Sequence, residues 1–430
     1  MAKPNILVLA DEDASLALAQ AGFAIAGDDM ERRQTAAIVI DTRGDHGARA
    51  GDLVRSLKSA LGPRAGLFMA WSDGSSDFET QAFDGVLDAT ATPHALSARL
   101  GSTLRIAVMA DEAKLRFNTL ARFGGSALPP VISAKTIPRI LLFGQPGPDL
   151  LRFSAVLVEL GAEHVAAFTS FTAFDYLHDS EFDAVVILAG DDRQLALSFC
   201  AAMRRNARMF HLPCLILGSP DFDNPDEAIE LGATDYGVAG DNDVAACDRL
   251  LTYIDEKRSR DALNLAFAAA RSPAAIEAST GLYSSAFFSD HLESLTRRAH
   301  ETDRPLSVCV AQVAVKAHDD MLISDQAMER LIAQAGSMLA RLVRTEDIAA
   351  RLDGCTFGVA FPSSDMEAAT IAATRIAAVL ECTAFDVQTD HTGLNHDHPV
   401  QVSLSISYAS LNLNETASDL LTRAIEGFKT

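Results

Sequence analysis

Two side chains of opposite charge, Arg344 and Asp347, stand three residues apart in the segment Arg-Thr-Glu-Asp. A guanidinium is a planar fork that pairs with phosphate oxygens or with the edge of a purine base, and a carboxylate accepts hydrogen bonds from base N–H groups. The same spacing at a helix end also forms an ordinary surface ion pair, which contributes only about 0.3 kcal/mol. The pair alone leaves both interpretations open.

Two further carboxylates, Asp11 and Asp41, follow short apolar runs, 5–9 and 37–40. Continuous apolar runs of this length are typical of buried strands in a parallel sheet. The sequence therefore predicts that each carboxylate lies at the end of a strand, where polar side chains of α/β proteins often do chemistry.

Length and charge limit the function. The chain has 430 residues and a formal net charge of −22, which suggests about three domains and argues against a nucleic-acid backbone as partner. A small basic pocket for a small anion is compatible with this charge. The six scattered cysteines, the lack of a signal-like apolar run and the lack of a long apolar stretch predict a cytoplasmic chain without a membrane span.

The elements that would position these residues form three segments. In the first, apolar runs alternate with helical periodicity, and in the second the same order of elements returns, which indicates an internal duplication of a doubly wound α/β unit. The third is α+β. The predicted strands are 5–9, 37–41, 66–72, 139–143, 184–188, 212–217, 306–311 and 400–410, with a hairpin over 349–361. The predicted helices are 46–61, 94–122, 243–270, 325–343 and 365–382.

The first segment, 1–125, resembles the receiver domains of response regulators. The resemblance makes Asp41 the candidate phospho-acceptor and Asp11 with Asp41 the candidate ligands of Mg²⁺. Ala10 stands where a second acid is usual, and Thr92-Pro93 stands where the family has Lys-Pro. Because that lysine senses the phosphoryl charge, a relic or turn-stabilising role for Asp41 is an equal alternative.

The second segment, 137–260, has the receiver outline without its chemistry. Phe143-Gly144, Ala189 and Ala239 occupy the positions of the acids, the acceptor and the lysine. We expect a degenerate unit that serves packing and dimerisation.

The third segment, 275–430, resembles the GGDEF domain of diguanylate cyclases. The matching stretches are 280–283 (TGLY), 351–357 (RLDGCTF) and 402–408 (VSLSISY). The resemblance implies an α/β and α+β multidomain fold: two flavodoxin-like receiver domains followed by a degenerate, nucleotidyl-cyclase-like GGDEF domain.

The positions of the cyclase chemistry carry other residues. The family's metal carboxylates fall on Gln312 and Cys355, and its signature Glu falls on Thr356. A neutral amide and a thiol are poor ligands for Mg²⁺, which prefers anionic oxygen. Ala317 and Asp320 replace residues near the phosphates and the guanine. We therefore expect a degenerate cyclase that is not an enzyme.

The RxxD inhibitory motif of this family is retained. Arg344 and Asp347 match it at the family's spacing, Arg375 falls on its second arginine, and Arg298 falls on an arginine contributed by a neighbouring domain. The resemblance implies that these four residues bind cyclic di-GMP.

Non-catalytic members of this kind are cyclic di-GMP effectors. The resemblance implies a homodimer joined through the receivers, an adaptor role in a protease pathway of the cell cycle, and recruitment to a cell pole. The alternative is a phosphorylation-driven regulator in which Asp41 sets assembly and the third segment is inert. Residues 390–398 have the composition of a metal site, but a solvated hairpin is the favoured interpretation.

Overall fold

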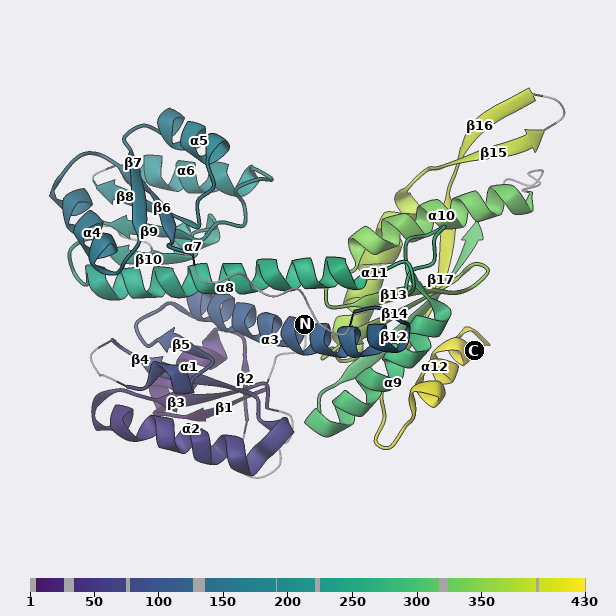
Figure 1. The fold of residues 1–430 in the computed structure, drawn as a ribbon, viewed down its shortest axis with the longest axis horizontal. Helices are drawn as coiled ribbons and strands as arrows, with labels where there is room; N and C mark the ends of the chain where they lie inside the picture. Colours follow the sequence, from purple (N-terminus) through teal and green to yellow (C-terminus); the bar gives the residue numbers. More distant parts are fainter. Residues whose placement is uncertain are drawn as a thin grey trace.

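The computed structural model describes residues 5–26, 35–74, 78–126, 136–190, 192–220, 225–316, 324–391 and 394–429. Two α/β units lie one above the other, and two long helices, α3 (Pro93–Arg122) and α8 (Asp243–Ala270), run from them to a third unit (Figure 1). Among the described residues, no helix is long and apolar enough to cross a membrane.

The first unit is a parallel five-stranded sheet in the order β2-β1-β3-β4-β5. Each strand predicted in this unit is present, and the prediction missed two strands: β2, which has two residues, and β5. The elements are β1 (Asn5–Leu9), α1 (Glu12–Gln20), β2 (Ala24–Ile25), β3 (Ala37–Asp41), α2 (Gly47–Leu61), β4 (Leu67–Ser72), β5 (Gly85–Asp88) and α3, with the short 3-10 helices η2 (Gly44–His46), η3 (Gly62–Arg64) and η4 (Thr80–Ala82).

The second unit repeats this order, β10-β9-β8-β6-β7, again all parallel. The predicted duplication is therefore confirmed. Its elements are β6 (Arg139–Gly144), α4 (Pro148–Glu159), β7 (Glu163–Ala167), α5 (Ser170–Asp179), β8 (Ala184–Gly190), α6 (Arg193–Arg205), β9 (Cys214–Gly218), α7 (Pro225–Glu230), β10 (Asp235–Val238) and α8.

The third unit is a mixed sheet in the order β11-β13-β14-β12-β17, in which β12 pairs antiparallel with β14 and β17. A two-stranded ribbon, β15 and β16, projects from it (Figure 1), and the predicted hairpin of 390–398 lies in this ribbon. The elements are β11 (Tyr283–Ser284), α9 (Ser285–Thr302), β12 (Leu306–Val315), α10 (Asp325–Leu342), β13 (Ile348–Asp353), β14 (Thr356–Pro362), α11 (Met366–Cys382), β15 (Phe385–His391), β16 (Leu394–Val400), β17 (Val402–Ser410), α12 (Ala417–Glu426) and η5 (Gly427–Lys429).

Helix α3 belongs to two hydrophobic cores. Near its start, Leu96 and Leu100 pack in the core of the first unit with Trp71. Near its end, Phe117 and Leu120 pack in the core of the third unit. The helix predicted over 94–122 is confirmed. Although the predicted first segment ends at residue 125, this helix packs in the cores of both the first and the third unit.

The two receiver-like units pack against each other within one chain. Arg99 of α3 pairs with Glu256 of α8 at 2.5 Å and stacks on the Tyr253 ring at 4.9 Å. Arg249 of α8 reaches Asp88 of β5 at 3.6 Å. This pairing occupies the faces formed by α3 and α8, so a homodimer through the receivers, which stays a prediction, must use other surfaces.

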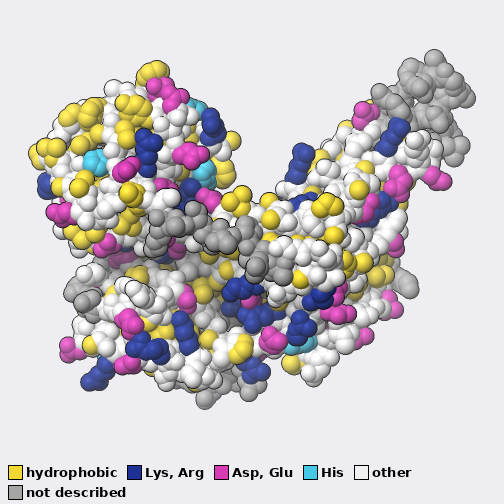
Figure 2. Space-filling model, viewed as in Figure 1, with side chains coloured by type: hydrophobic (Ala, Val, Ile, Leu, Met, Phe, Trp, Pro, Cys, Tyr) yellow, Lys and Arg dark blue, Asp and Glu magenta, His cyan; other side chains and the backbone are white. Residues whose placement is uncertain are grey.

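Large hydrophobic side chains are exposed on the second unit, where they gather over its outer surface (Figure 2). Phe171 of α5 is 81% exposed and Leu151 of α4 is 70% exposed.

Candidate functional site

Residues 344–347, which we call the RxxD turn, connect α10 to β13. The amide of Asp347 donates to the carbonyl of Arg344 at 3.1 Å, and the amide of Arg344 donates to Oδ2 of Asp347 at 3.2 Å. These two bonds close the turn. The Asp347 carboxylate is thus engaged by the backbone of the turn, which the simple surface-pair interpretation did not anticipate.

Arg375 of α11 lies beside this turn. Its guanidinium donates to the carbonyl of Leu342 at 3.5 Å, two residues before Arg344. Arg344 and Arg375 are both exposed, whereas Asp347 is only 6% exposed. The structure therefore brings three of the four predicted ligand residues to one edge of the third unit, with the two guanidinium groups facing solvent.

The Asp347 carboxyl has an unusual pKa. Burial and the neighbouring Glu346 carboxylate raise the pKa of Asp347 to about 7, against the opposing effect of Arg344. The group is therefore close to half ionised at neutral pH.

Helix α3, which starts in the first unit, contacts the RxxD turn through two arginines. The Arg116 guanidinium donates to the carbonyl oxygens of Thr345, Glu346 and Asp347 at 3.3, 3.2 and 3.2 Å. Arg105, three helical turns earlier, donates to both carboxylate oxygens of Glu346 at 3.0 and 3.3 Å. Sequence reasoning missed both arginines, since no local pattern links α3 to a turn more than 200 residues away.

Arg116 is itself held in a buried network. Its guanidinium donates to Oε1 of Glu112 at 2.9 and 2.7 Å and stacks on the Phe267 ring at 4.6 Å. Glu112 Oε1 also contacts Nε2 of His291 at 2.8 Å. Arg116, Glu112 and His291 are 3%, 2% and 0% exposed, so α3, α9 and the turn share one polar cluster inside the protein.

Arg298, the fourth predicted ligand residue, pairs with helix α3. Its guanidinium donates two bonds to Asp111 of α3, at 2.7 and 2.9 Å. In this structure these two bonds hold α9 to α3, and the contribution of Arg298 to a ligand site stays a prediction.

The positions that the resemblance assigns to the cyclase metal ligands lie together, and the residues at these positions are not acidic. Gln312 on β12 is paired with Thr356 on β14, and the carbonyl of Cys355 accepts a bond from the Val313 amide at 2.9 Å. The side chains at these three positions are an amide, a thiol and a hydroxyl, and Asp353 is paired with Thr356 in the same hairpin. Ala317 and Asp320, which were also considered, lie outside the described residues.

Asp11 and Asp41 also meet, at the carboxyl ends of the neighbouring strands β1 and β3. The Arg43 guanidinium lies between them, with Nη2 at 2.5 Å from Asp11 Oδ2 and 2.8 Å from Asp41 Oδ2. The Ala14 amide and then Arg43 lower the pKa of Asp11, and Arg43 lowers the pKa of Asp41. This donor set, two carboxylates already bound to a cationic side chain, does not fit a magnesium ion.

The corresponding edge of the second unit is apolar. Phe143 and Ala189 are 2% and 6% exposed, and the Phe143 ring lies 4.3 Å from that of Phe199. That this unit lacks receiver chemistry stays a prediction.

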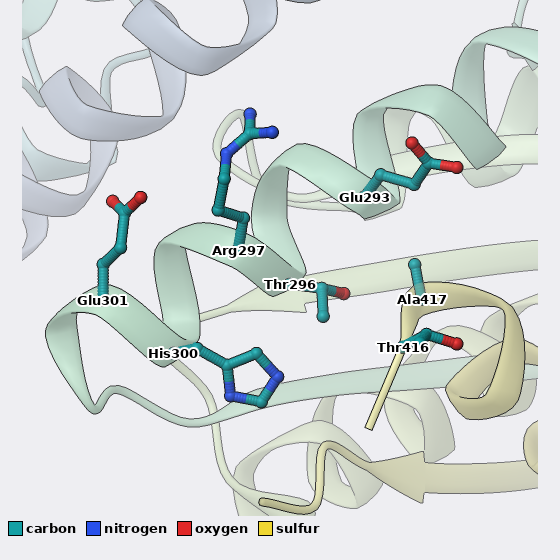
Figure 3. A pocket seen from close by; sticks show the side chains of 7 residues that line it. All are labelled: Glu293, Thr296, Arg297, His300, Glu301, Thr416 and Ala417. Atoms are coloured by element: carbon teal, nitrogen blue, oxygen red, sulfur yellow. The ribbon is translucent and has the colours of Figure 1, made fainter. Parts of the chain in front are cut away.

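Two cavities lie apart from the RxxD turn. One, of about 550 Å³, lies along α9 beside the start of α12, with Arg297 and Glu301 on its rim (Figure 3). A second cavity, of about 480 Å³, lies between the first and third units, and Arg304 and Asp365 are among the residues that line it. Arg344, Asp347 and Arg375 do not line either cavity.

Comparison with known proteins agrees with this architecture. Residues 274–428 match the family model "Diguanylate cyclase, GGDEF domain". The response regulator PleD of Caulobacter vibrioides is 26% identical over 373 residues, which cover 86% of this chain and 79% of PleD.

Solved GGDEF domains are also similar. The GGDEF domain of DgcB from Caulobacter crescentus, solved in complex with c-di-GMP, is 17% identical and covers 37% of this chain and 87% of its own, with a TM-score of 0.31. The GGDEF domain of FimX from Pseudomonas aeruginosa is 21% identical and covers 36% and 91%, with a TM-score of 0.30. The C-terminal part of the chain thus matches the GGDEF family model, and the chain, with its two N-terminal parallel α/β sheets, resembles PleD.

Proposed function

We propose that this chain is a non-catalytic receptor for cyclic di-GMP that acts as a signalling adaptor. The observation that carries the proposal is the position of Arg344 and Arg375, two exposed guanidinium groups beside the closed RxxD turn. Cyclic di-GMP carries phosphate charges and exposed guanine edges. Guanidinium groups bind both, and the Asp347 carboxylate complements guanine N–H groups.

The proposal includes the absence of cyclase activity. Joining two GTP molecules requires divalent ions held by carboxylates, which neutralise the triphosphate and activate the attacking hydroxyl. Gln312 and Cys355 stand at those positions. Incubation with GTP and either Mg²⁺ or Mn²⁺, followed by chromatography of the nucleotides, is expected to give no cyclic di-GMP. Its formation would contradict this part of the proposal.

The downstream role rests on resemblance alone. With the cyclase residues replaced and the RxxD motif retained, the chain resembles PopA, a non-catalytic cyclic di-GMP effector related to PleD. We accordingly propose an adaptor role in the regulated proteolysis of the cell cycle and recruitment to a cell pole. A ligand-dependent change in the position of a fluorescently tagged chain would test the recruitment.

Calorimetric titration of the full chain with cyclic di-GMP tests the binding. The parent is expected to bind saturably, and Arg344→Ala is expected to lose binding because one of the two guanidinium groups is removed. Arg341→Ala is the matched control: Arg341 is exposed in the last turn of α10, three residues before the motif. No binding by the parent would make the motif a relic, and unchanged binding by Arg344→Ala would place the site elsewhere.

A further inference from the structure

The acidic edge of the first unit contains its own cation. Arg43 follows Asp41 by two residues and pairs with both Asp41 and Asp11. Its Nη2 bridges the two carboxylates, and its Nε donates to Asp41 Oδ1 at 3.0 Å. The backbone amide of Arg43 donates to the same oxygen at 2.9 Å, which fixes the start of the loop after β3.

All four carboxylate oxygens of this cluster have a donor. Asp11 Oδ1 accepts the Ala14 amide at 2.9 Å, and the other three oxygens accept bonds from Arg43. Mg²⁺ takes about six oxygen ligands in near-ideal octahedral geometry. A magnesium ion would therefore have to displace the guanidinium, and Ala10 supplies no further carboxylate.

We propose that Arg43 is the resident cation of this edge and replaces the divalent ion, so that the first unit responds neither to Mg²⁺ nor to phosphoryl donors. The guanidinium compensates the two carboxylates locally and links the carboxyl ends of β1 and β3. It also occupies the oxygens of Asp41 that a phosphoryl acceptor would use. The first unit then serves as a fixed module that holds α3. This inference concerns a different part of the chain from the RxxD turn and stands independently of the proposed ligand.

The chain contains a reporter for this cluster. Trp71 is its single tryptophan, is 2% exposed and is paired with Asp41 in the sheet register. The Trp71 carbonyl accepts two bonds from Thr42, from its amide and its hydroxyl, each at 3.0 Å. Because Thr42 lies between Asp41 and Arg43, a cation that moved the Arg43 loop would change the surroundings of the indole.

The first test titrates the full chain with MgCl₂ and then with beryllium fluoride, a phosphoryl mimic, while Trp71 fluorescence is recorded. We expect no saturable change in the parent and none in Asp41→Asn. Acetyl phosphate with Mg²⁺ is expected to leave the mass of the parent unchanged. A saturable change in the parent that Asp41→Asn abolishes, or a phosphoryl group on Asp41, would overturn the proposal.

The second test removes the cation. Arg43→Gln leaves two adjacent carboxylates uncompensated, so Mg²⁺ is expected to change its fluorescence saturably and to raise its Tm, and Asp41→Asn added to this variant is expected to abolish both effects. Arg55→Gln is the control, since Arg55 pairs with Asp52 and Glu79 on the exposed side of α2.

A folded Arg43→Gln chain without a response to Mg²⁺ would show that Arg43 is not what excludes the ion. Circular dichroism establishes whether the variant is folded. If it is not, the comparison of the parent with Asp41→Asn decides the proposal by itself.

Discussion

Asp347 closes the RxxD turn, and its carboxyl group has a raised pKa. Its carboxylate accepts the Arg344 amide inside the turn, and burial raises its pKa to about 7. A carboxylic acid that is close to half protonated at neutral pH is a poorer acceptor for guanine N–H groups than a carboxylate. Any ligand that needs the ionised form must therefore release a proton when it binds below this pKa.

This gives a pH dependence for the proposed ligand. From pH 8 to pH 6, the ionised fraction of Asp347 falls about tenfold, and the affinity for cyclic di-GMP is expected to fall about tenfold with it. Calorimetry in buffers of different ionisation enthalpy measures both the affinity and the proton release. Arg341→Ala is expected to show the same profile. An affinity that is flat over this range would exclude Asp347 as an acceptor of the ligand.

The Asp347 carboxyl also makes the stability of the fold depend on pH. Stability is expected to fall as the pH rises, whereas the affinity for the ligand is expected to rise. The folded pKa of this carboxyl lies above the unfolded value, so the unfolded state holds fewer protons between about pH 4 and pH 7, and this group lowers stability as the pH rises through that range. Asp347→Asn removes the cost of the buried charge. The variant is expected to have a higher Tm than the parent at pH 8 and a smaller difference at pH 5.

Thermal unfolding of both chains at the two pH values measures this difference. A lower Tm for Asp347→Asn at pH 8 would mean that the Arg344–Asp347 bond matters more than the burial of the charge. Together with the binding data, this separates a structural from a ligand-contacting role.

At the scale of elements, α3 is held to the third unit by a buried polar cluster. Arg116→Met leaves Glu112 with His291 as its remaining partner in the cluster and removes the donor of the three turn carbonyls. Breaking a buried pair by removing one partner costs about 3 to 5 kcal/mol. Urea unfolding of the full chain is expected to show a loss of this size in the transition that includes α3.

Arg105→Ala is the matched control on the same helix. The Arg105 side chain is 53% exposed, and exposed ion pairs contribute about 0.2 to 1 kcal/mol. An equal loss of unfolding free energy in the two variants would contradict the expectation that the buried Arg116 holds α3 more strongly than the exposed Arg105. The double variant Glu112→Leu/Arg116→Met is expected to recover part of the loss, because it removes the uncompensated carboxylate as well.

The sequence predicts helix α3 well but does not predict which residues this helix contacts. Periodicity placed a helix over 94–122, and the structure has it over Pro93–Arg122. The pair Glu112 and Arg116 is visible as an i,i+4 spacing, but this spacing does not indicate that Arg116 binds carbonyls about 230 residues later. Arg43 was within reach of sequence reasoning, since a cation two residues after Asp41 is a local signal. The partner of Arg298 was not, because it depends on how α3 packs on α9.

At the scale of the whole molecule, α3 joins the first unit to the proposed ligand site. Its start packs with Trp71 and its end with the third unit, while Arg116 holds the backbone of the RxxD turn. A ligand that binds the turn in this conformation stabilises the docked position of α3 by the same free energy with which docking favours the ligand. If the proposed ligand binds there, the first unit is coupled to binding through α3 without contacting the ligand.

Hydrogen exchange on the full chain tests this coupling. Saturating cyclic di-GMP is expected to slow amide exchange in the RxxD turn and also in residues 105–122 of α3, whereas β6 and β8 of the second unit keep their rates. Arg344→Ala, which is expected not to bind, serves as the control and should show no protection in either segment. Protection confined to the turn would mean that α3 is docked equally in both states. The signal would then have to leave through the exposed surface of the third unit, and the network of Arg116, Glu112 and His291 would serve stability alone.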